Sequence, residues 1–176
     1  MKKISVLLCV ILLLTACFAS AEGGSVVEIS GAFRLDGILP EGYSFSEASR
    51  NETTLDGRIA SDNPAAPVLQ VYIAFNDNES YAKAKGLKDL SEEELALVKL
   101  SFSGEGSVSF ESFETASGDS LLVIRDADGE FLDFYTVCFG YEIELTLFPA
   151  EGRALAEAEI SRCLELMKSL DIVPAR

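Results

Sequence analysis

Histidine is absent from all 176 residues of this chain, and tryptophan is absent as well. Without histidine the chain cannot build a Ser-His-Asp triad or a Cys-His pair, and it lacks the ligand that most zinc and copper sites use. No glycine-rich turn carries the lysine of a nucleotide-phosphate site. The sequence therefore predicts no catalytic residue, no cofactor and no metal site.

Long apolar runs are also missing. The longest, from Ile4 to Leu14, falls short of the roughly 20 residues that a membrane-spanning helix needs. Because Lys2 and Lys3 precede it, this run predicts the apolar region of a secretory signal peptide and no transmembrane anchor.

Two processing signals follow the apolar run. The small residues Ala-Ser-Ala at 19–21 suit signal peptidase, which predicts a signal peptide over 1–21 and a single domain over 22–176. Leu-Thr-Ala-Cys at 14–17 resembles the lipobox of bacterial lipoproteins, which would leave a lipidated Cys17. Phe18, the bulky residue after that cysteine, favours cleavage after residue 21 over lipidation. We therefore expect a secreted or extracytoplasmic protein. A lipid anchor on the outer face of the membrane is the alternative.

Positive charge is scarce, with 14 lysines and arginines against 29 acidic residues and a net charge of −15. Loss of the two leader lysines would take the net charge to −17. Such a field repels phosphate backbones and anionic lipids, so we expect no nucleic-acid partner. The acidity is typical of a soluble surface, and attraction of a cationic partner is its functional alternative.

Few cysteines remain in the predicted mature chain. Cys9 and Cys17 belong to the leader if cleavage follows residue 21, which leaves Cys138 in a predicted strand and Cys163 in a predicted helix. An oxidising compartment permits a disulfide between them. Two separately buried thiols are the favoured interpretation.

Apolar residues alternate with polar ones in several stretches, which is typical of strands with one buried face. The clearest stretches are 69–75 and 141–147, and punctuation by glycine and proline indicates further strands. These further strands are predicted at 32–39, 43–49, 55–61, 108–115, 120–126 and 131–139. Between Phe110 and Phe113 the alternation slips, which predicts a bulge or an early end to that strand.

Two helices have clear signals. Ser91 and Glu94 form a capping box, with Leu90 and Leu95 at the positions of a hydrophobic staple. One short helix is predicted before it, within residues 78–86. From residue 151 onward, apolar residues recur at helical spacing and predict a closing amphipathic helix. Strands mixed with helices in this order predict an α+β fold with an antiparallel β-sheet flanked by helices.

Acidic residues suggest two further chemistries. The turn Asp126–Glu130 has three carboxylates, but it lacks the glycine and the closing glutamate of a calcium loop, so a hairpin turn is favoured. Two carboxyl groups could also hydrolyse a glycoside without histidine, which makes a glycan hydrolase the enzymatic alternative.

The element order and turn residues carry a resemblance to a known family. Leu-Pro-Glu-Gly-Tyr at 39–43, the helix start at 91–95, a three-strand meander and Leu-Thr-Leu-Phe-Pro-Ala-Glu-Gly at 145–152 resemble secreted bacterial members of the PsbP-like (Mog-type) superfamily. The resemblance implies a sandwich of an antiparallel sheet and helices, used mostly as a non-catalytic accessory or binding module.

We therefore expect a secreted or envelope-associated, non-enzymatic domain that acts by surface contacts with a protein or envelope component. The ligand and the oligomeric state are left open by the sequence. A glycan hydrolase, a Cys17-anchored lipoprotein with the same binding role, and a purely structural envelope component are the alternatives.

Overall fold

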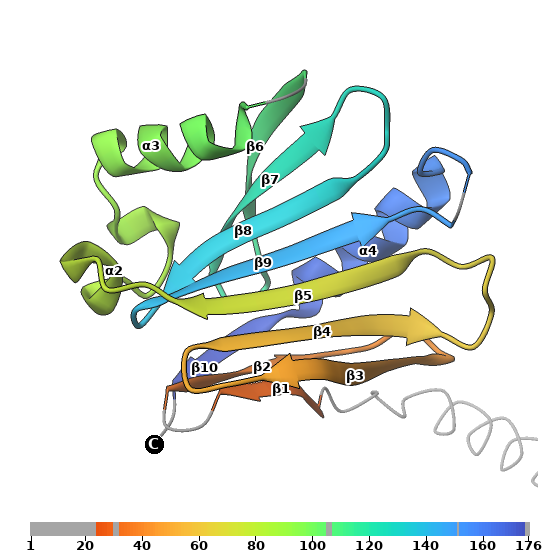
Figure 1. The fold of residues 1–176 in the computed structure, drawn as a ribbon, viewed down its shortest axis with the longest axis horizontal. Helices are drawn as coiled ribbons and strands as arrows, with labels where there is room; N and C mark the ends of the chain where they lie inside the picture. Colours follow the sequence, from red (N-terminus) through yellow and green to blue (C-terminus); the bar gives the residue numbers. More distant parts are fainter. Residues whose placement is uncertain (1–23, 30–31, 105–106, 151, 175–176) are drawn as a thin grey trace, which may run out of the picture.

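Two antiparallel sheets form the framework of the protein (Figure 1). The structure is a computed structural model that describes residues 24–29, 32–104, 107–150 and 152–174. The predicted signal peptide, with Cys17, lies outside these residues. The larger sheet has seven strands in the order β3-β4-β5-β9-β8-β7-β6. These strands are β3 (Tyr43–Arg50), β4 (Thr54–Ser61), β5 (Val68–Phe75), β6 (Val108–Glu114), β7 (Ser120–Asp126), β8 (Leu132–Cys138) and β9 (Tyr141–Phe148).

The pairing of β5 with β9 joins two meanders into this sheet. Strands β3 to β5 follow one another as hairpins, and so do strands β6 to β9. The chain leaves β5, crosses to the far edge and returns to place β9 beside β5, where Leu69 opposes Leu147 and Tyr72 opposes Glu144. Segments from the two halves of the chain thus form the middle of the sheet.

A smaller sheet has the order β1-β2-β10 and brings both ends of the described chain together. Its strands are β1 (Gly24–Ile29), β2 (Phe33–Gly37) and β10 (Asp171–Pro174). The sequence analysis predicted neither β1 nor β10. It placed the final helix at the end of the domain, which is wrong, because β10 follows the helix and pairs with β2.

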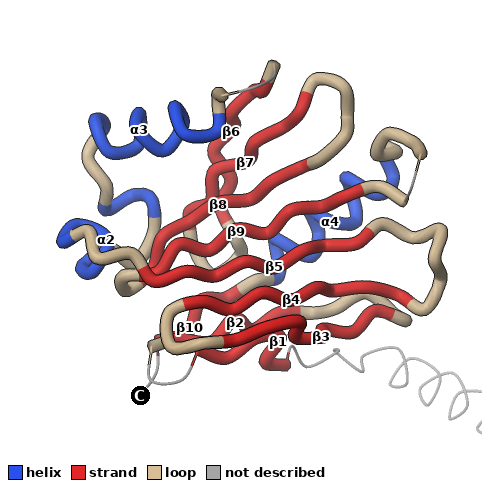
Figure 2. The backbone as a smooth tube through the Cα atoms, viewed as in Figure 1, coloured by secondary structure: helices blue, strands red, loops and turns tan. Residues whose placement is uncertain are grey.

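Helix α4 (Glu157–Ser169) and the smaller sheet cover one face of the seven-stranded sheet (Figures 1 and 2). Four α4 side chains at helical spacing are buried there, namely Ile160, Cys163, Leu166 and Met167. The predicted amphipathic helix is therefore confirmed, although it begins at residue 157 and not at 151. Burial of such an apolar stripe supplies most of the stability of a helix in a globular protein.

The opposite face is covered over only part of its width. Helices α2 (Glu79–Lys83) and α3 (Glu92–Phe102) and the 3₁₀ turn η1 (Leu87–Asp89) pack on β7 and β8 in a second apolar cluster. Over β3, β4 and β5 the same face carries exposed side chains, including Arg58, Gln70 and Tyr72.

The expected bulge between Phe110 and Phe113 is wrong. Strand β6 pairs with β7 residue by residue from Val108 to Glu114 without a shift in register. Phe110 packs in the cluster beneath α3, whereas Phe113 packs in the cluster beneath α4. The apolar alternation slips because both faces of this strand have a partner, and the backbone itself stays regular.

The architecture bears out the predicted α+β class with antiparallel sheets and helices, and β-structure dominates it. The finer PsbP-like assignment remains a prediction. Among the helices that the structure describes, none has the length and apolar character to cross a membrane.

Helix α3 begins with the predicted capping box. The amide of Glu94 donates to Ser91 Oγ at 3.3 Å, and the amide of Ser91 donates to Glu94 Oε2 at 2.8 Å. The staple residues Leu90 and Leu95 are partly buried against the second apolar cluster. Two amides that the helix cannot satisfy internally therefore have partners.

Replacing Ser91 with Ala should lower the free energy of unfolding by about 1 kcal/mol, because the Glu94 amide loses its acceptor. Urea denaturation measures the change. Ser101→Ala is the control, since Ser101 only donates to the Val98 carbonyl within the same helix, and alanine is the better helix former. Equal stability of the Ser91 variant and the wild type would contradict a role for the cap.

Candidate functional site

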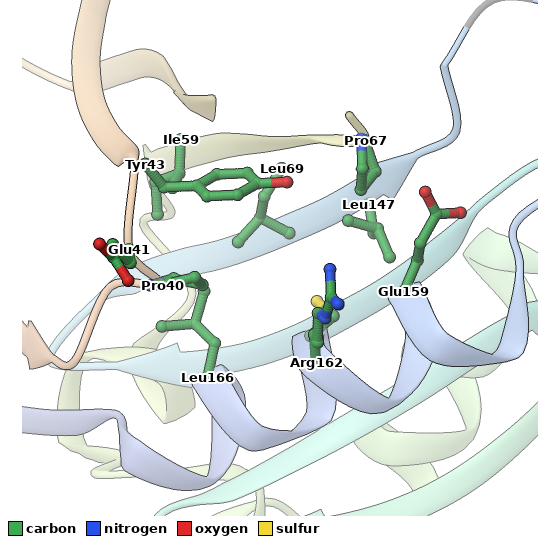
Figure 3. Close-up of a pocket in the computed structure, with 11 residues that line it drawn as sticks. Pro40, Glu41, Tyr43, Ile59, Pro67, Leu69, Leu147, Glu159, Arg162 and Leu166 are labelled. Carbon is green, nitrogen blue, oxygen red and sulfur yellow. The ribbon is translucent and has the colours of Figure 1, made fainter. Parts of the chain in front are cut away.

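A pocket of about 270 Å³ opens between α4 and the seven-stranded sheet (Figure 3). We call it the α4 pocket. Its lining is mostly apolar, and polar side chains lie at its rim. The lining residues are Pro40, Glu41, Tyr43, Ile59, Pro67, Leu69, Leu147, Glu159, Arg162, Cys163 and Leu166.

The periodicity of α4 brings four of these residues to one side of the pocket. Arg162 and Cys163 follow Glu159 by three and four residues, and Leu166 follows them by four and three, so the four share one side of the helix. Cys163 and Leu166 are buried on this face, whereas Arg162 is exposed. One side of the helix thus provides both an apolar wall, formed by Cys163 and Leu166, and the charged Arg162 at the rim.

The opposite wall belongs to the sheet. Leu69 and Leu147 oppose each other across the β5–β9 pairing, and Ile59 on β4 opposes Leu69. All three are buried residues of the main core. The floor of the pocket therefore lies on the seam where the two meanders join.

Two loops complete the rim. Gly42 has a φ of 80°, a conformation that glycine adopts without strain, and the Tyr43 amide donates to the Pro40 carbonyl to close this turn. The turn projects the Tyr43 ring across the top of the pocket (Figure 3). On the other side, Pro67 ends the loop between β4 and β5.

An ion pair neutralises Glu159 at the rim. Arg153 binds both of its carboxylate oxygens, with N···O distances of 2.5 and 2.6 Å, and the Ala156 amide donates to Oε2 at 2.9 Å. The hydrogen bonds from Arg153 are the largest cause that holds the pKa of Glu159 below its usual range. Arg153 also donates to the Ala65 carbonyl, which ties the loop before Pro67 to the helix start.

Arg34, Arg50 and Arg153 each form an ion pair, whereas Arg162, like Arg58 and Arg125, forms none among the described residues. With the residues that the structure describes, Arg162 forms neither an ion pair nor a side-chain hydrogen bond. Its guanidinium rises from α4 toward the Tyr43 ring (Figure 3). It is therefore a cation at the pocket mouth whose donors are available to a ligand.

Two further ionisable groups of the pocket, Tyr43 and Cys163, are neutral at physiological pH. Burial raises the pKa of the Cys163 thiol to about 12. Burial also raises the pKa of Tyr43, against the opposing effect of the Arg162 charge. A thiol with such a high pKa is a poor nucleophile. Cys163 therefore contributes apolar surface and Tyr43 a hydrogen-bond donor, and neither is activated for covalent chemistry.

Cys138 and Cys163 are free, buried thiols in the structure. Cys138 ends β8 and Cys163 lines the α4 pocket. Burial is the largest cause that raises the pKa of Cys138 to about 12 as well. The possible disulfide between them is thus absent from this arrangement, and reductant provides its test in solution.

A carboxyl pair that the sequence analysis did not identify lies on the other face of the sheet. Asp133 in β8 is 3% exposed, and its carboxyl group hydrogen-bonds to that of Glu144 in β9. Thr146 donates to Asp133 Oδ1 at 3.0 Å. The only signal in the sequence was a single aspartate inside the apolar stretch 131–139.

Burial dominates the electrostatics of this pair. It is the largest cause that raises the pKa of Asp133 to about 7, and the negative charge of Glu144 acts in the same direction. The hydrogen bond from Thr146 opposes the shift. Burial raises the pKa of Glu144 too. The pair therefore shares a proton over much of the acidic pH range, as carboxyl groups in contact do.

The geometry of the pair gives no support to glycoside hydrolysis. That reaction places a sugar between two carboxyl groups, which are about 5 Å apart in retaining enzymes and further apart in inverting ones. Asp133 and Glu144 instead contact each other, and Asp133 is buried away from any substrate.

The turn Asp126–Glu130 uses its first carboxylate for its own backbone. Asp126 Oδ2 accepts from the amides of Asp128 and Glu130, each at 3.0 Å. Gly129, with a φ of 72°, allows the chain to reverse between β7 and β8. The predicted hairpin turn is confirmed. Within the described ranges, no group of three or more His, Cys, Asp or Glu side chains is arranged to hold a metal ion.

Comparison of this chain with models of known protein families and with curated proteins finds no match. The resemblance to the PsbP-like superfamily and every functional assignment therefore remain to be argued from the residues themselves.

Asp133 should make the protein less stable as the pH rises from about 4 to about 7. Over this range the native carboxyl keeps a proton that the unfolded chain has lost, so each pH unit costs up to about 1.4 kcal/mol from this group. Asp133→Asn removes the titration and keeps the acceptor for Thr146. Urea denaturation should find the variant more stable than the wild type at pH 8, with the advantage shrinking toward pH 4.

Asp56→Asn is the matched control, because Asp56 lies on the same face but is only partly buried. Its difference from the wild type should depend much less on pH. An Asp133 variant whose stability follows the wild-type pH profile would contradict the raised pKa.

Reductant should leave the stability of the mature domain unchanged, because Cys138 and Cys163 are separate thiols in the structure. Denaturation midpoints with and without dithiothreitol measure this. A loss of roughly 2–4 kcal/mol on reduction would instead establish a disulfide.

Proposed function

We propose that this protein is a secreted or envelope-associated binding domain without enzymatic activity, and that the α4 pocket holds its ligand. The observation that carries the proposal is the pocket itself. It combines an apolar floor of Ile59, Leu69 and Leu147 with a rim cation, Arg162. Ligand sites of proteins typically have this composition, with a few polar groups that orient a mostly apolar ligand.

Three features of the pocket support binding without catalysis. Glu159 is paired with Arg153, and the thiol of Cys163 has a raised pKa, so neither is poised to transfer a proton or attack a substrate. Tyr43, also with a raised pKa, is suited to donate a hydrogen bond and unsuited to act as a base. A glycan hydrolase is the weaker candidate because Asp133 is buried and lies against Glu144, which leaves no room for a sugar between the two carboxyl groups.

Exposed apolar side chains outside the pocket support the surface contacts that the sequence analysis expected. Leu97 and Leu100 lie one turn apart on α3 and are 65% and 67% exposed. The two side chains add apolar surface that a partner could cover.

The extracytoplasmic address rests on the sequence of the leader. Cleavage after Ala21 would release the domain, and lipidation of Cys17 would instead hold the same pocket beside a membrane surface. The binding role is the same in both cases, since the α4 pocket lies within residues 40–166.

Binding of an apolar probe to the pocket tests the proposal. Titration of the mature domain with 1-octanol should shift the methyl NMR signals of Ile59, Leu69 and Leu147 saturably, with smaller changes elsewhere. Leu69→Phe adds bulk at the pocket floor and should weaken binding at least tenfold, because the ring occupies the space that the probe needs. Overpacking also costs this variant about 1–3 kcal/mol, so its fold is checked first by its NMR spectrum.

Leu97→Phe is the control, because it makes the same exchange on the exposed face of α3. It should bind octanol as the wild type does. If octanol causes no saturable shift in the pocket methyl signals, the α4 pocket is not the binding site.

A further inference from the structure

We infer that the ligand of the α4 pocket is a small amphiphile with one apolar chain and a single carboxylate. This inference rests on the proposed function, which makes the pocket a binding site, and it adds the chemical class of the ligand. The apolar chain would lie on Leu69 and Leu147, and the carboxylate would meet Arg162 at the mouth.

The state of Arg162 argues for an anionic head group. Arg153 binds Glu159 with both of its terminal nitrogens, so the acid nearest to the helix start is already neutralised. Arg162, one turn further along α4, has no partner among the described residues. A guanidinium presents parallel N–H donors that match the two oxygens of a carboxylate.

Figure 3 shows how the polar rim is arranged. The Arg162 guanidinium lies between the Tyr43 ring and Glu159, whereas Glu41 lies at the opposite end of the pocket beside Pro40. The Tyr43 hydroxyl points across the pocket, where it can donate a hydrogen bond to an oxygen of the head group. The anion would thus be held on the Arg162 side, away from the negative charge of Glu41.

The charge of the whole protein limits how negative the head group can be. A net charge of −15 repels every anion, and the repulsion is twice as large for a doubly charged phosphate as for a carboxylate. One exposed arginine can offset a single charge more readily than two. We therefore assign a carboxylate and not a phosphate monoester.

The size of the pocket limits the rest of the ligand. At about 270 Å³, its volume lies just below the range of roughly 300–1,000 Å³ that is typical of sites for drug-sized molecules. The floor carries no charged side chain, since Ile59, Leu69 and Leu147 form it. A chain of medium length fits this space better than a long lipid.

Binding of three probes with the same eight-carbon chain tests the head group. Octanoate, 1-octanol and octylammonium are titrated into the mature domain at pH 7.5 and low salt, well below their micelle concentrations, with the pocket methyl NMR signals as readout. Octanoate should bind roughly fivefold more tightly than octanol, a modest factor because Arg162 is exposed. Octylammonium should bind more weakly than octanol to the pocket.

Arg162→Gln should remove the preference for octanoate and leave the affinity for octanol unchanged. Arg58→Gln is the matched control, because it changes the net charge equally but lies on β4 facing the other side of the sheet. It should keep nearly all of the preference. Increasing salt should reduce the preference in the wild type and in the Arg58 variant but have no such effect in the Arg162 variant.

The outcomes separate this inference from the proposed function. If octanol and octanoate bind equally, the pocket is a binding site but the carboxylate assignment is overturned. Tighter binding of octyl phosphate than of octanoate would also overturn it, as would tighter binding of a short peptide that ends in an apolar residue. If none of the probes reaches the pocket, the proposed function fails first.

Discussion

The pairing of β5 with β9 is the constraint on which the rest of the structure depends. It joins two meanders that would otherwise each expose a long strand edge, and it does so between residues far apart in the sequence. Consecutive side chains of β9 lie on opposite faces of the sheet. Leu147 faces α4 and the pocket, whereas Thr146 faces the carboxyl pair and donates to Asp133. The two most distinctive sites of the protein are therefore back to back on one strand.

These two sites handle buried or crowded charge in different ways. Among the described residues, no cation forms an ion pair with buried Asp133 or half-buried Glu144, and the raised pKa of Asp133 keeps a proton in the pair. Glu159 instead stays ionised, because Arg153 and the Ala156 amide supply hydrogen bonds to its charged form. The first arrangement removes charge from the interior. In the second, Arg162 is left as a cation with which no described acid forms an ion pair.

The strands with one buried face were predictable from the sequence, because their alternation depends on local chemistry alone. Strand β7 was predicted with its observed bounds, and the Ser91 cap was predicted to the residue. Strands β1 and β10 were missed because β10 has only four residues and each depends on β2 as a partner. A slip in alternation at Phe110 and Phe113 was misinterpreted, because the sequence does not reveal that both faces of β6 are covered.

The pocket could not be predicted, for a related reason. Leu69, Leu147 and Leu166 have the pattern of ordinary core residues, and nothing local distinguishes a core position that meets a neighbour from one that borders a cavity. The cavity lies between α4 and the sheet, beside the loops that contain Pro40 and Pro67. The whole fold sets the separation of α4 from the sheet there. Arg162 gives a weak signal of the pocket in the sequence, because its charged side chain shares a helix face with the apolar positions Cys163 and Leu166.

That placement of Arg162 bears on why the pocket stays open. An arginine on the buried stripe of a helix cannot enter an apolar core without losing its hydration, so it keeps its head group at the surface and prevents α4 from closing fully on β4. Glu159, held upright by Arg153, acts in the same way one turn earlier. The polar rim is therefore both the part of the pocket that can recognise a charged group and the reason that the apolar floor beneath it remains accessible.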